Sequence, residues 1–312
     1  PPQEPPQAAQ LASAPQVVKG AAERQEVSHR ALLMGEAHLD GCRHDRWAKA
    51  FDPANTPTDF VDALEVVFKS INDQVIKSVR SLKSGRGRTK QPVAVVFNEE
   101  HIGKILSEKE VAAWTAEVSA AAAPHVGALV EAAGVTSMQS ATLAVGAEFG
   151  AEAAAFNMQN TRVADWIARQ TDEIGRGCTA THTKELRKIM ERGAREGLSP
   201  GQLASEMRKV QKDGKGVFSR YQAERIARTE AAFAGTAGQI EGWKQSGVVE
   251  GKKFTTAGDP CELCEAVKAE YGGRTLPLDY TMYHKDDTLV LESGKEIVLD
   301  YSDLLGPPIH PN

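Results

Sequence analysis

The sequence predicts an α+β fold, namely a mainly helical bundle with a small C-terminal antiparallel β subdomain. Apolar residues recur every three or four positions through most of the first 245 residues, which is the period of amphipathic helices. Alanine is abundant in the middle of the chain, where it allows helices to approach closely. The last 60 residues instead contain short alternating runs around turn residues, a pattern typical of antiparallel strands.

Length and composition narrow the class of protein. The chain has 312 residues, a net charge of -5 and 41% hydrophobic residues, which allows two or three domains. There is no run of 18 apolar residues and no secretory signal, so we expect no contact with a membrane. Four scattered cysteines do not make a disulfide framework, which favours a reducing compartment. A first residue that is not Met suggests a processed product or a piece of a longer chain.

Changes in composition divide the chain into four predicted segments. Residues 1–20 are rich in Pro, Gln and Ala and are predicted to be a flexible linker. Residues 21–106 form an N-terminal helical region with a basic hinge, and residues 107–218 form an alanine-rich helical scaffold. Residues 219–312 contain the C-terminal β hairpin and a cluster of Cys and His.

A long helix is predicted after the stretch NTPTDF. Thr56 is the expected N-cap, Pro57 the first helical residue and Asp59 the partner in a capping box. The apolar stripe that follows spans about seven turns and predicts packing against another helix: Phe60, Leu64, Val67, Ile71, Val75, Val79 and Leu82.

The stretch KSGRGRTKQP, from Lys83 to Pro92, interrupts the helical pattern. It has four basic residues, two glycines and no acidic residue. A solvated hinge explains this composition, and so does a flexible loop whose Arg86 and Arg88 contact DNA phosphates.

The alanine-rich scaffold is predicted to contain several helices. Ser107 and Glu110 resemble a capping box at the start of the first, and Pro124 is expected to interrupt it. Asn160 or Thr161 is expected to cap a further helix.

Two short helices should come next. The first is expected to end near Gly197, and the second to begin with Ser199 as N-cap, Pro200 at the first position and Gln202 as the reciprocal cap. A tight turn between two helices occurs in DNA-reading helix-turn-helix motifs, but it is equally common in plain helical hairpins, which we favour.

Charge is distributed unevenly over the last third of the chain. Residues 177–246 contain 13 Lys and Arg against 8 Asp and Glu, whereas residues 247–312 contain 6 against 12. The first segment suits either a solvated helix face or an anionic partner, and the second would repel such a partner. We therefore expect any binding of double-stranded DNA to be weak, salt-sensitive and without sequence preference.

A helix is predicted from about Ser219 to Gln245. Ile226, Phe233 and Ile240 repeat every seven residues, and Glu230 falls on the same apolar stripe. A carboxylate on such a stripe must find a partner, so we expect Glu230 to be largely buried and paired with a basic or hydroxyl group. Its replacement by Ala is expected to lower stability by roughly 1–3 kcal/mol.

The C-terminal residues predict strands and a possible metal site. GKKFTTA is predicted to be a strand, and TLVLESGKEIVLDY a hairpin that turns at Ser293-Gly294. Cys261 and Cys264 are two residues apart, and His310 could supply a third ligand, so zinc is a candidate cofactor. A redox dithiol and uncommitted thiols are the alternatives.

One stretch resembles the phage Mu F-like head morphogenesis family, the minor capsid proteins of tailed phages. The resemblance runs through YQAERIARTEAAFAGTAGQIEGWKQSGVVEGKKFTTAGDPCELC and rests most on Arg225, Arg228, Thr229 and Glu230. It continues in the terminal Pro-Ile-His-Pro-Asn, after which the family typically has Cys-Arg-Cys. The specific match covers residues 219–312 and implies that a fourth metal ligand would follow Asn312.

The resemblance implies a structural protein of the prohead and not an enzyme. It suggests a virion protein near the portal vertex that is in the host cytoplasm during assembly. Its implied partners are the portal, scaffold or capsid proteins and DNA. The family's domain is also fused to portal proteins, so a portal C-terminal region is one alternative. The other is a zinc-dependent hydrolase or toxin-associated domain built on Cys261, Cys264 and His310.

Overall fold

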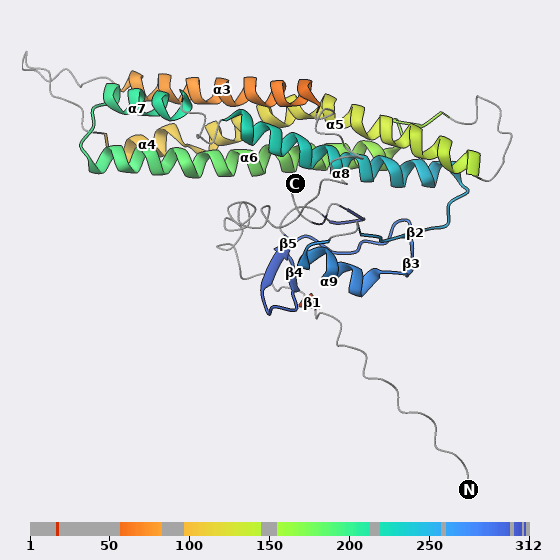
Figure 1. Cartoon of the computed structure of the whole chain (residues 1–312). Helices are drawn as coiled ribbons and strands as arrows, with labels where there is room; N and C mark the ends of the chain where they lie inside the picture. Colours follow the sequence, from red (N-terminus) through yellow and green to blue (C-terminus); the bar gives the residue numbers. More distant parts are fainter. Residues whose placement is uncertain are drawn as a thin grey trace, which may run out of the picture. The chain divides into compact units, whose positions relative to one another are not determined.

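The computed structural model describes residues 17–18, 57–82, 97–144, 155–212, 219–256, 260–299, 303–307 and 309. The chain divides into two compact units, one of residues 48–249 and one of residues 250–310 together with 1–47 (Figure 1). The first is all helical in its described part, and the second combines one helix with small antiparallel sheets. This confirms the predicted fold class.

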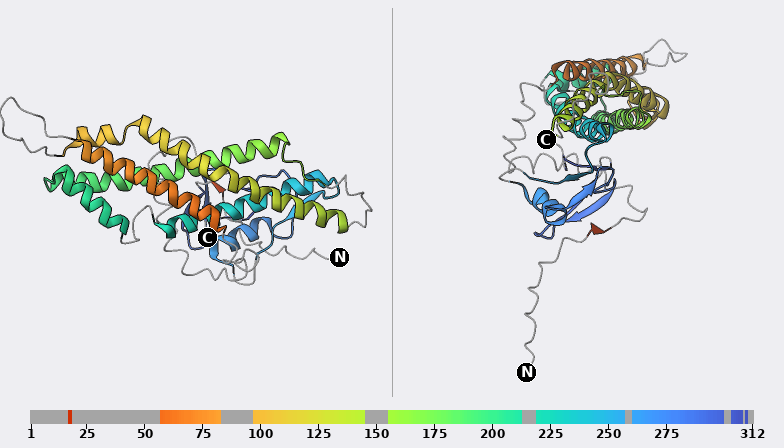
Figure 2. Two further views of the ribbon diagram at one scale, coloured as in Figure 1. Left: turned by 90° about the horizontal axis from the view of Figure 1, so that it is seen from above. Right: turned by 90° about the vertical axis from the view of Figure 1, so that its right-hand side faces the viewer.

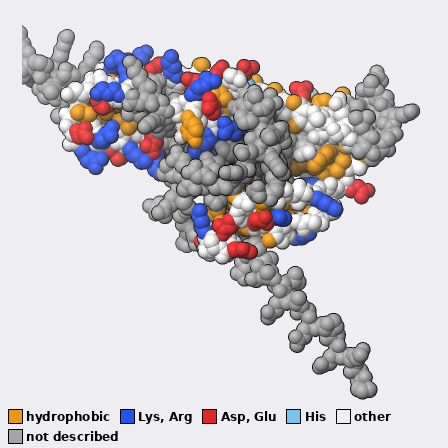
Figure 3. All heavy atoms as spheres, viewed as in Figure 1, with side chains coloured by type: hydrophobic (Ala, Val, Ile, Leu, Met, Phe, Trp, Pro, Cys, Tyr) orange, Lys and Arg blue, Asp and Glu red, His pale blue; other side chains and the backbone are white. Residues whose placement is uncertain are grey.

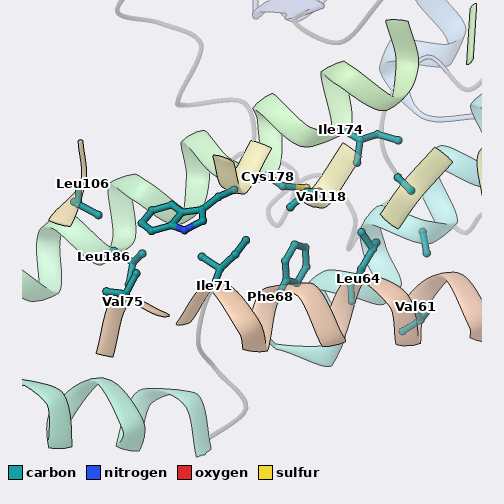
Figure 4. Close-up of a cluster of buried hydrophobic side chains, with 14 of the residues drawn as sticks. Val61, Leu64, Phe68, Ile71, Val75, Leu106, Val118, Ile174, Cys178 and Leu186 are labelled. Atoms are coloured by element: carbon teal, nitrogen blue, oxygen red, sulfur yellow. The ribbon is translucent and has the colours of Figure 1, made fainter. Parts of the chain in front are cut away.

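Helix α3 (Thr58–Ser81) places the predicted apolar stripe in the core of the helical unit. Its buried positions continue from Phe60 to Val79 and pack against side chains of α5 and α6 (Figure 4). The stripe differs from the prediction at two positions, because Phe68 is buried where Val67 is half-buried, and Leu82 is half-buried at the C-cap. The N-cap is Pro57, which has no side-chain group that could cap the helix, and the predicted cap Thr56 lies outside the described residues.

Helices α4 (Glu99–Ile105) and α5 (Glu108–Ala144) follow. The Ser107 cap is confirmed, because its Oγ accepts a hydrogen bond from the Glu110 N–H at 3.4 Å. The interruption predicted at Pro124 is wrong, since α5 continues through this residue. Pro124 and Ala120 both face solvent, so the carbonyl of Ala120 that loses its helical partner can bond to water.

Helix α6 (Thr161–Arg195) is one helix where the sequence suggested two. Asn160 caps it as predicted, with its side chain accepting from the Arg162 N–H at 3.0 Å. Gly175 does not break it, because its missing side chain serves packing: a Cβ there would overlap Ser119 Oγ and the Thr115 carbonyl oxygen of α5. The close approach of α5 and α6 therefore requires glycine at position 175.

Helices α7 (Pro200–Lys212) and α8 (Arg220–Ser246) complete the helical unit, and the views in Figure 2 show its long helices side by side. The capping box of α7 is confirmed, since the Ser199 N–H donates to Gln202 Oε1 at 2.9 Å and the Gln202 N–H donates to Ser199 Oγ at 3.4 Å. Helix α8 packs along α5, so the boundary predicted at residue 219 falls inside this unit.

A second close helix contact joins α8 to α5. A Cβ at Gly238 would overlap the Val130 carbonyl oxygen, and one at Gly242 would overlap the backbone of Gly134. Glycine at these two positions lets the backbones of α5 and α8 touch. The alanine-rich sequence predicted close helix packing but not the positions of the contact.

The second unit contains two small sheets. Strand β1 (Val17–Val18) pairs with β4 (Asp287–Val290), and β4 pairs with β5 (Glu296–Leu299), all antiparallel. Strand β1 lies in the segment that was predicted to be a linker. The predicted hairpin is confirmed, with Gly294 at φ 77° in its turn, and the predicted strand after residue 250 is β2 (Gly251–Lys253), paired with β3 (Thr275–Pro277).

Helix α9 (Glu262–Tyr271) packs its buried face, including Leu263 and Val267, in the second unit. The Tyr271 hydroxyl donates to the Met282 carbonyl at 2.7 Å, and Tyr283 donates to Glu270 Oε2 at 2.6 Å. Buried Lys252 donates to the carbonyls of Leu278 and Tyr280. These bonds hold α9 and the segment after β3 together.

One described segment, Glu99–Thr142, is long and apolar enough to cross a membrane by length and composition alone. Core helices of soluble proteins pass the same test. Part of the segment is buried here, including the row Trp114, Val118, Ala122, Val126 and Val130 in the helical core.

Candidate functional site

The residues that carry the family resemblance lie on the N-terminal half of α8. This helix begins after Ser219, whose side chain accepts from the Gln222 N–H at 3.3 Å. Arg225 is half-buried, Arg228 is exposed and Thr229 is 5% exposed. The four predicted motif residues therefore face different environments and do not converge on one point.

Glu230 reaches from α8 to α6. Its Oε2 accepts a hydrogen bond from Gln170 Nε2 at 2.6 Å. Glu230 is largely buried, as expected, but the expectation of a basic or hydroxyl partner is wrong, because the partner is an amide. A neutral donor satisfies the carboxyl group without bringing a second charge into the helix interface.

The environment of Glu230 changes its acidity. Burial raises its pKa from 4.5 to about 7, the hydrogen bond from Gln170 opposes this, and the charge of Glu173 adds to it. Burial, and then the Glu230 charge, raises the pKa of the Cys178 thiol to about 12. Cys178 therefore stays a protonated thiol at physiological pH and is a poor nucleophile.

A partly buried group of charged side chains at the other end of α8 was missed by the sequence reasoning. Glu241 is 7% exposed and accepts from Arg162 Nε at 3.2 Å and from Lys244 Nζ at 2.9 Å. Gln245 Oε1 accepts from the Asn157 N–H at 2.7 Å nearby. The signal was present: Glu241 lies three residues after Gly238, on the close-packed face, with Lys244 three residues further on.

A row of polar side chains is also buried on α6. His182 contacts the Phe68 ring of α3 edge-on, with ring centroids 4.5 Å apart. Thr179 Oγ1 and Thr183 Oγ1, and Asn72 Nδ2 on α3, are buried without a hydrogen-bond partner among the described residues. Such groups cost about 1–3 kcal/mol each when they stay unpaired, so internal water is the expected partner.

Cys261 and Cys264 lie at the start of α9. Cys261 is the N-cap residue, Cys264 falls in the first turn, and both are half-buried. The sequence had suggested a tight turn in an antiparallel setting, whereas a helix start is also where redox dithiols occur. Glu262 Oε1 accepts from the Ser293 N–H at 2.9 Å and ties this turn to the β4–β5 hairpin.

The predicted third ligand, His310, lies outside the described residues, as do Arg86 and Arg88. His284 is described, and its Nδ1 lies 3.5 Å from Asp303 Oδ1. Within the described ranges, no group of three or more His, Cys, Asp or Glu is placed to hold a metal ion. Zinc binding by Cys261, Cys264 and His310 therefore stays a prediction.

We expect zinc to bind this chain weakly and to bind tightly once Cys-Arg-Cys is added after Asn312. Three protein ligands leave a tetrahedral site open, whereas a fourth thiolate closes it and couples metal binding to folding. Chelator should then lower the melting temperature of the extended chain by more than about 5 °C. Zinc content and melting curves with and without chelator measure this.

The matched control is the extended chain with Cys261→Ser and Cys264→Ser, which should hold no zinc at this site. An extended chain that binds no zinc, and whose melting temperature chelator leaves unchanged, would show that the cysteine pair is not a metal site.

Comparison with known proteins gives no relative. No family model matches the chain, and no curated protein and no solved structure is significantly similar to it. The resemblance to the Mu F-like family therefore rests on the residues named above.

Proposed function

We propose that this chain is a structural protein of phage head assembly, present in few copies and acting at or near the portal vertex. The observation that carries the proposal is the ordered set of motifs: Arg225 to Glu230, Asp259-Pro260-Cys261 with Cys264, and the terminal His-Pro-Asn. Portal, scaffold or capsid proteins are its proposed partners, and packaged DNA is a further one.

The placement of these motifs is compatible with a scaffold role. Thr229 and Glu230 lie within the packed helical unit, where Glu230 bonds to Gln170 and so links two long helices. Cys178, the thiol near Glu230, is held protonated by burial. These residues hold helices together, and in the described part of the chain they form no pairing of a nucleophile with a base.

Deletion of the gene from the phage or prophage that encodes it tests the proposal. We expect host lysis on schedule but a loss of infectious particles of at least 100-fold, with complementation by this chain from a plasmid. Electron microscopy of the lysate should show proheads or empty heads. Normal titres and filled heads after deletion would contradict a role in head assembly.

A further inference from the structure

We propose that the solvent face of the second half of α6 binds the phosphate backbone of double-stranded DNA. We call this surface the basic face of α6, and it consists of Lys184, Arg187, Lys188, Arg192 and Arg195. The inference deepens the proposed function, on which its biological setting rests, by giving the DNA contact a location. It is a second candidate contact beside the loop of Arg86 and Arg88, which lies outside the described residues.

Helical periodicity puts these side chains on one side. At 100° per residue, the five positions fall within an arc of about 140°. The opposite side of the same helix carries buried His182, Leu186, Met190 and Gly193. Arg187, Lys188, Arg192 and Arg195 are exposed and Lys184 is half-exposed, so the face is turned to solvent.

The two halves of α6 differ in how their cations are used. In the first half, Arg162 pairs with Glu241, Arg176 Nη2 lies 2.6 Å from Asp172 Oδ2, and Arg169 Nε donates to the Asp165 carbonyl. In the second half, Lys188 pairs with Glu185.

The remaining cations of the basic face, Lys184, Arg187, Arg192 and Arg195, have no carboxylate oxygen within 4.0 Å in the part of the chain that the structure describes. Arg192 lines a pocket with Glu196 and Glu206, which reduce its field, whereas cations that are not neutralised internally are available to an external anion.

Acidic residues reduce the field of this face without cancelling it. From Lys184 to Lys209 there are seven Lys and Arg against four Asp and Glu, a balance of +3. Figure 3 shows charged side chains gathered over the end of the helical unit where α6 meets α7. Glu191 lies among the cations of the face, so we expect moderate affinity, with contacts made by individual Arg and Lys side chains.

The shape and chemistry of the face fit a nucleic-acid backbone. Lys184 to Arg195 spans about 16 Å of rigid helix, which corresponds to roughly five base pairs of axial rise. A guanidinium group can donate two parallel hydrogen bonds to the oxygens of one phosphate group. Three of the four cations without an internal carboxylate partner are arginines.

An anionic membrane is a poorer fit, because binding there requires large apolar side chains beside the cations. The large hydrophobic side chains that are exposed in the described residues are Val66, Tyr221 and Tyr280, none of them on α6.

The test compares the full chain with Arg187→Gln, Arg192→Gln and Arg195→Gln combined, using a 30-base-pair duplex of mixed sequence and fluorescence anisotropy from 50 to 200 mM salt. The parent is expected to give a slope of log K against log salt of about -3 to -4. Removing three phosphate contacts should reduce the slope by about 2–3 and weaken binding at 100 mM salt at least tenfold. A second, unrelated duplex should bind equally well.

The matched control removes the same charge elsewhere in the helical unit: Lys104→Gln, Arg169→Gln and Arg176→Gln combined. Lys104 and Arg176 are paired with carboxylates, and Arg169 donates to a backbone carbonyl on the first half of α6, away from the basic face, so the control should keep the parental slope within about 1. Circular dichroism establishes that both variants remain folded. Equal weakening in the two variants, or parental binding by the basic-face variant, would overturn the proposal.

Two further comparisons distinguish DNA from a membrane as the partner, and this inference from the proposed function. Stronger binding to phosphatidylserine vesicles than to DNA, lost in the same variant, would make the face a membrane contact and overturn the inference. The binding assay uses purified chain, so its outcome is independent of whether the chain enters phage particles. A chain that is found in particles but binds no duplex would keep the proposed function and remove this inference.

Discussion

Replacing Gly238 with Ala is expected to lower the free energy of unfolding of the helical unit by about 2–4 kcal/mol. At an ordinary helical position this change raises stability by about 0.5–1 kcal/mol, because alanine restricts the unfolded chain. Gly238 is different, since its Cβ would overlap the Val130 carbonyl oxygen and come within 2.9 Å of the Ala133 Cβ. Backbone atoms cannot move aside as a flexible side chain can, so α5 and α8 must separate.

Gly177→Ala is the matched control. Gly177 lies inside α6 and is exposed, and a Cβ there would meet nothing within 4 Å. We expect this variant to be more stable than the parent by about 0.5–1 kcal/mol. Urea denaturation followed by circular dichroism at 222 nm measures both. A Gly238→Ala variant that gains stability as the control does would show that α5 and α8 are not in backbone contact.

The second large effect is pH-dependent stabilisation by Glu230→Gln. The pKa of Glu230 in the folded chain is about 7, against 4.5 ordinarily, so between these values the folded state holds a proton that the unfolded state has lost. The stability of the parent should therefore fall as pH rises from about 5 to 7. The full shift corresponds to about 3 kcal/mol, and partial exposure of Glu230 reduces the expected change to about 1–2 kcal/mol.

The Glu230→Gln variant keeps a side-chain oxygen that can accept the hydrogen bond from Gln170. It removes the carboxyl group, so nothing titrates at this position. Parent and variant should thus be similar in stability at pH 5, and the variant should be more stable at pH 8 by about 1–2 kcal/mol. Glu131→Gln, which removes an exposed carboxylate from α5, controls for the loss of one negative charge. A constant difference between the Glu230→Gln variant and the parent from pH 5 to pH 8 would contradict the raised pKa.

Local signals allowed much of the fold to be predicted. The box of Ser199 and Gln202, the cap at Ser219 and the turn at Ser293-Gly294 each act within a few residues, so the sequence contains the whole interaction. The apolar period of α3 likewise determines its buried face, with a shift from Val67 to Phe68. These features define the helices and strands but not which of them pack against one another.

Errors arose where a distant helix decides the outcome. The sequence suggested two helices where α6 is one, and the role of Gly175 inside it is set by Thr115 and Ser119 of α5. The partner of Glu230 is Gln170, 60 residues away, and no spacing rule connects the two. Cys261 caps a helix whose start was not expected from the Asp-Pro that precedes it.

The copy number of this chain in purified phage particles tests the account most directly. Proheads and mature particles, separated on density gradients, are digested and the chain is quantified by mass spectrometry against the major capsid protein. The account predicts a few copies per particle, present already in proheads, with peptides from both the helical unit and the C-terminal unit. Absence from proheads and particles, while the chain is abundant in the same lysate, would contradict its role as a structural protein of the phage head.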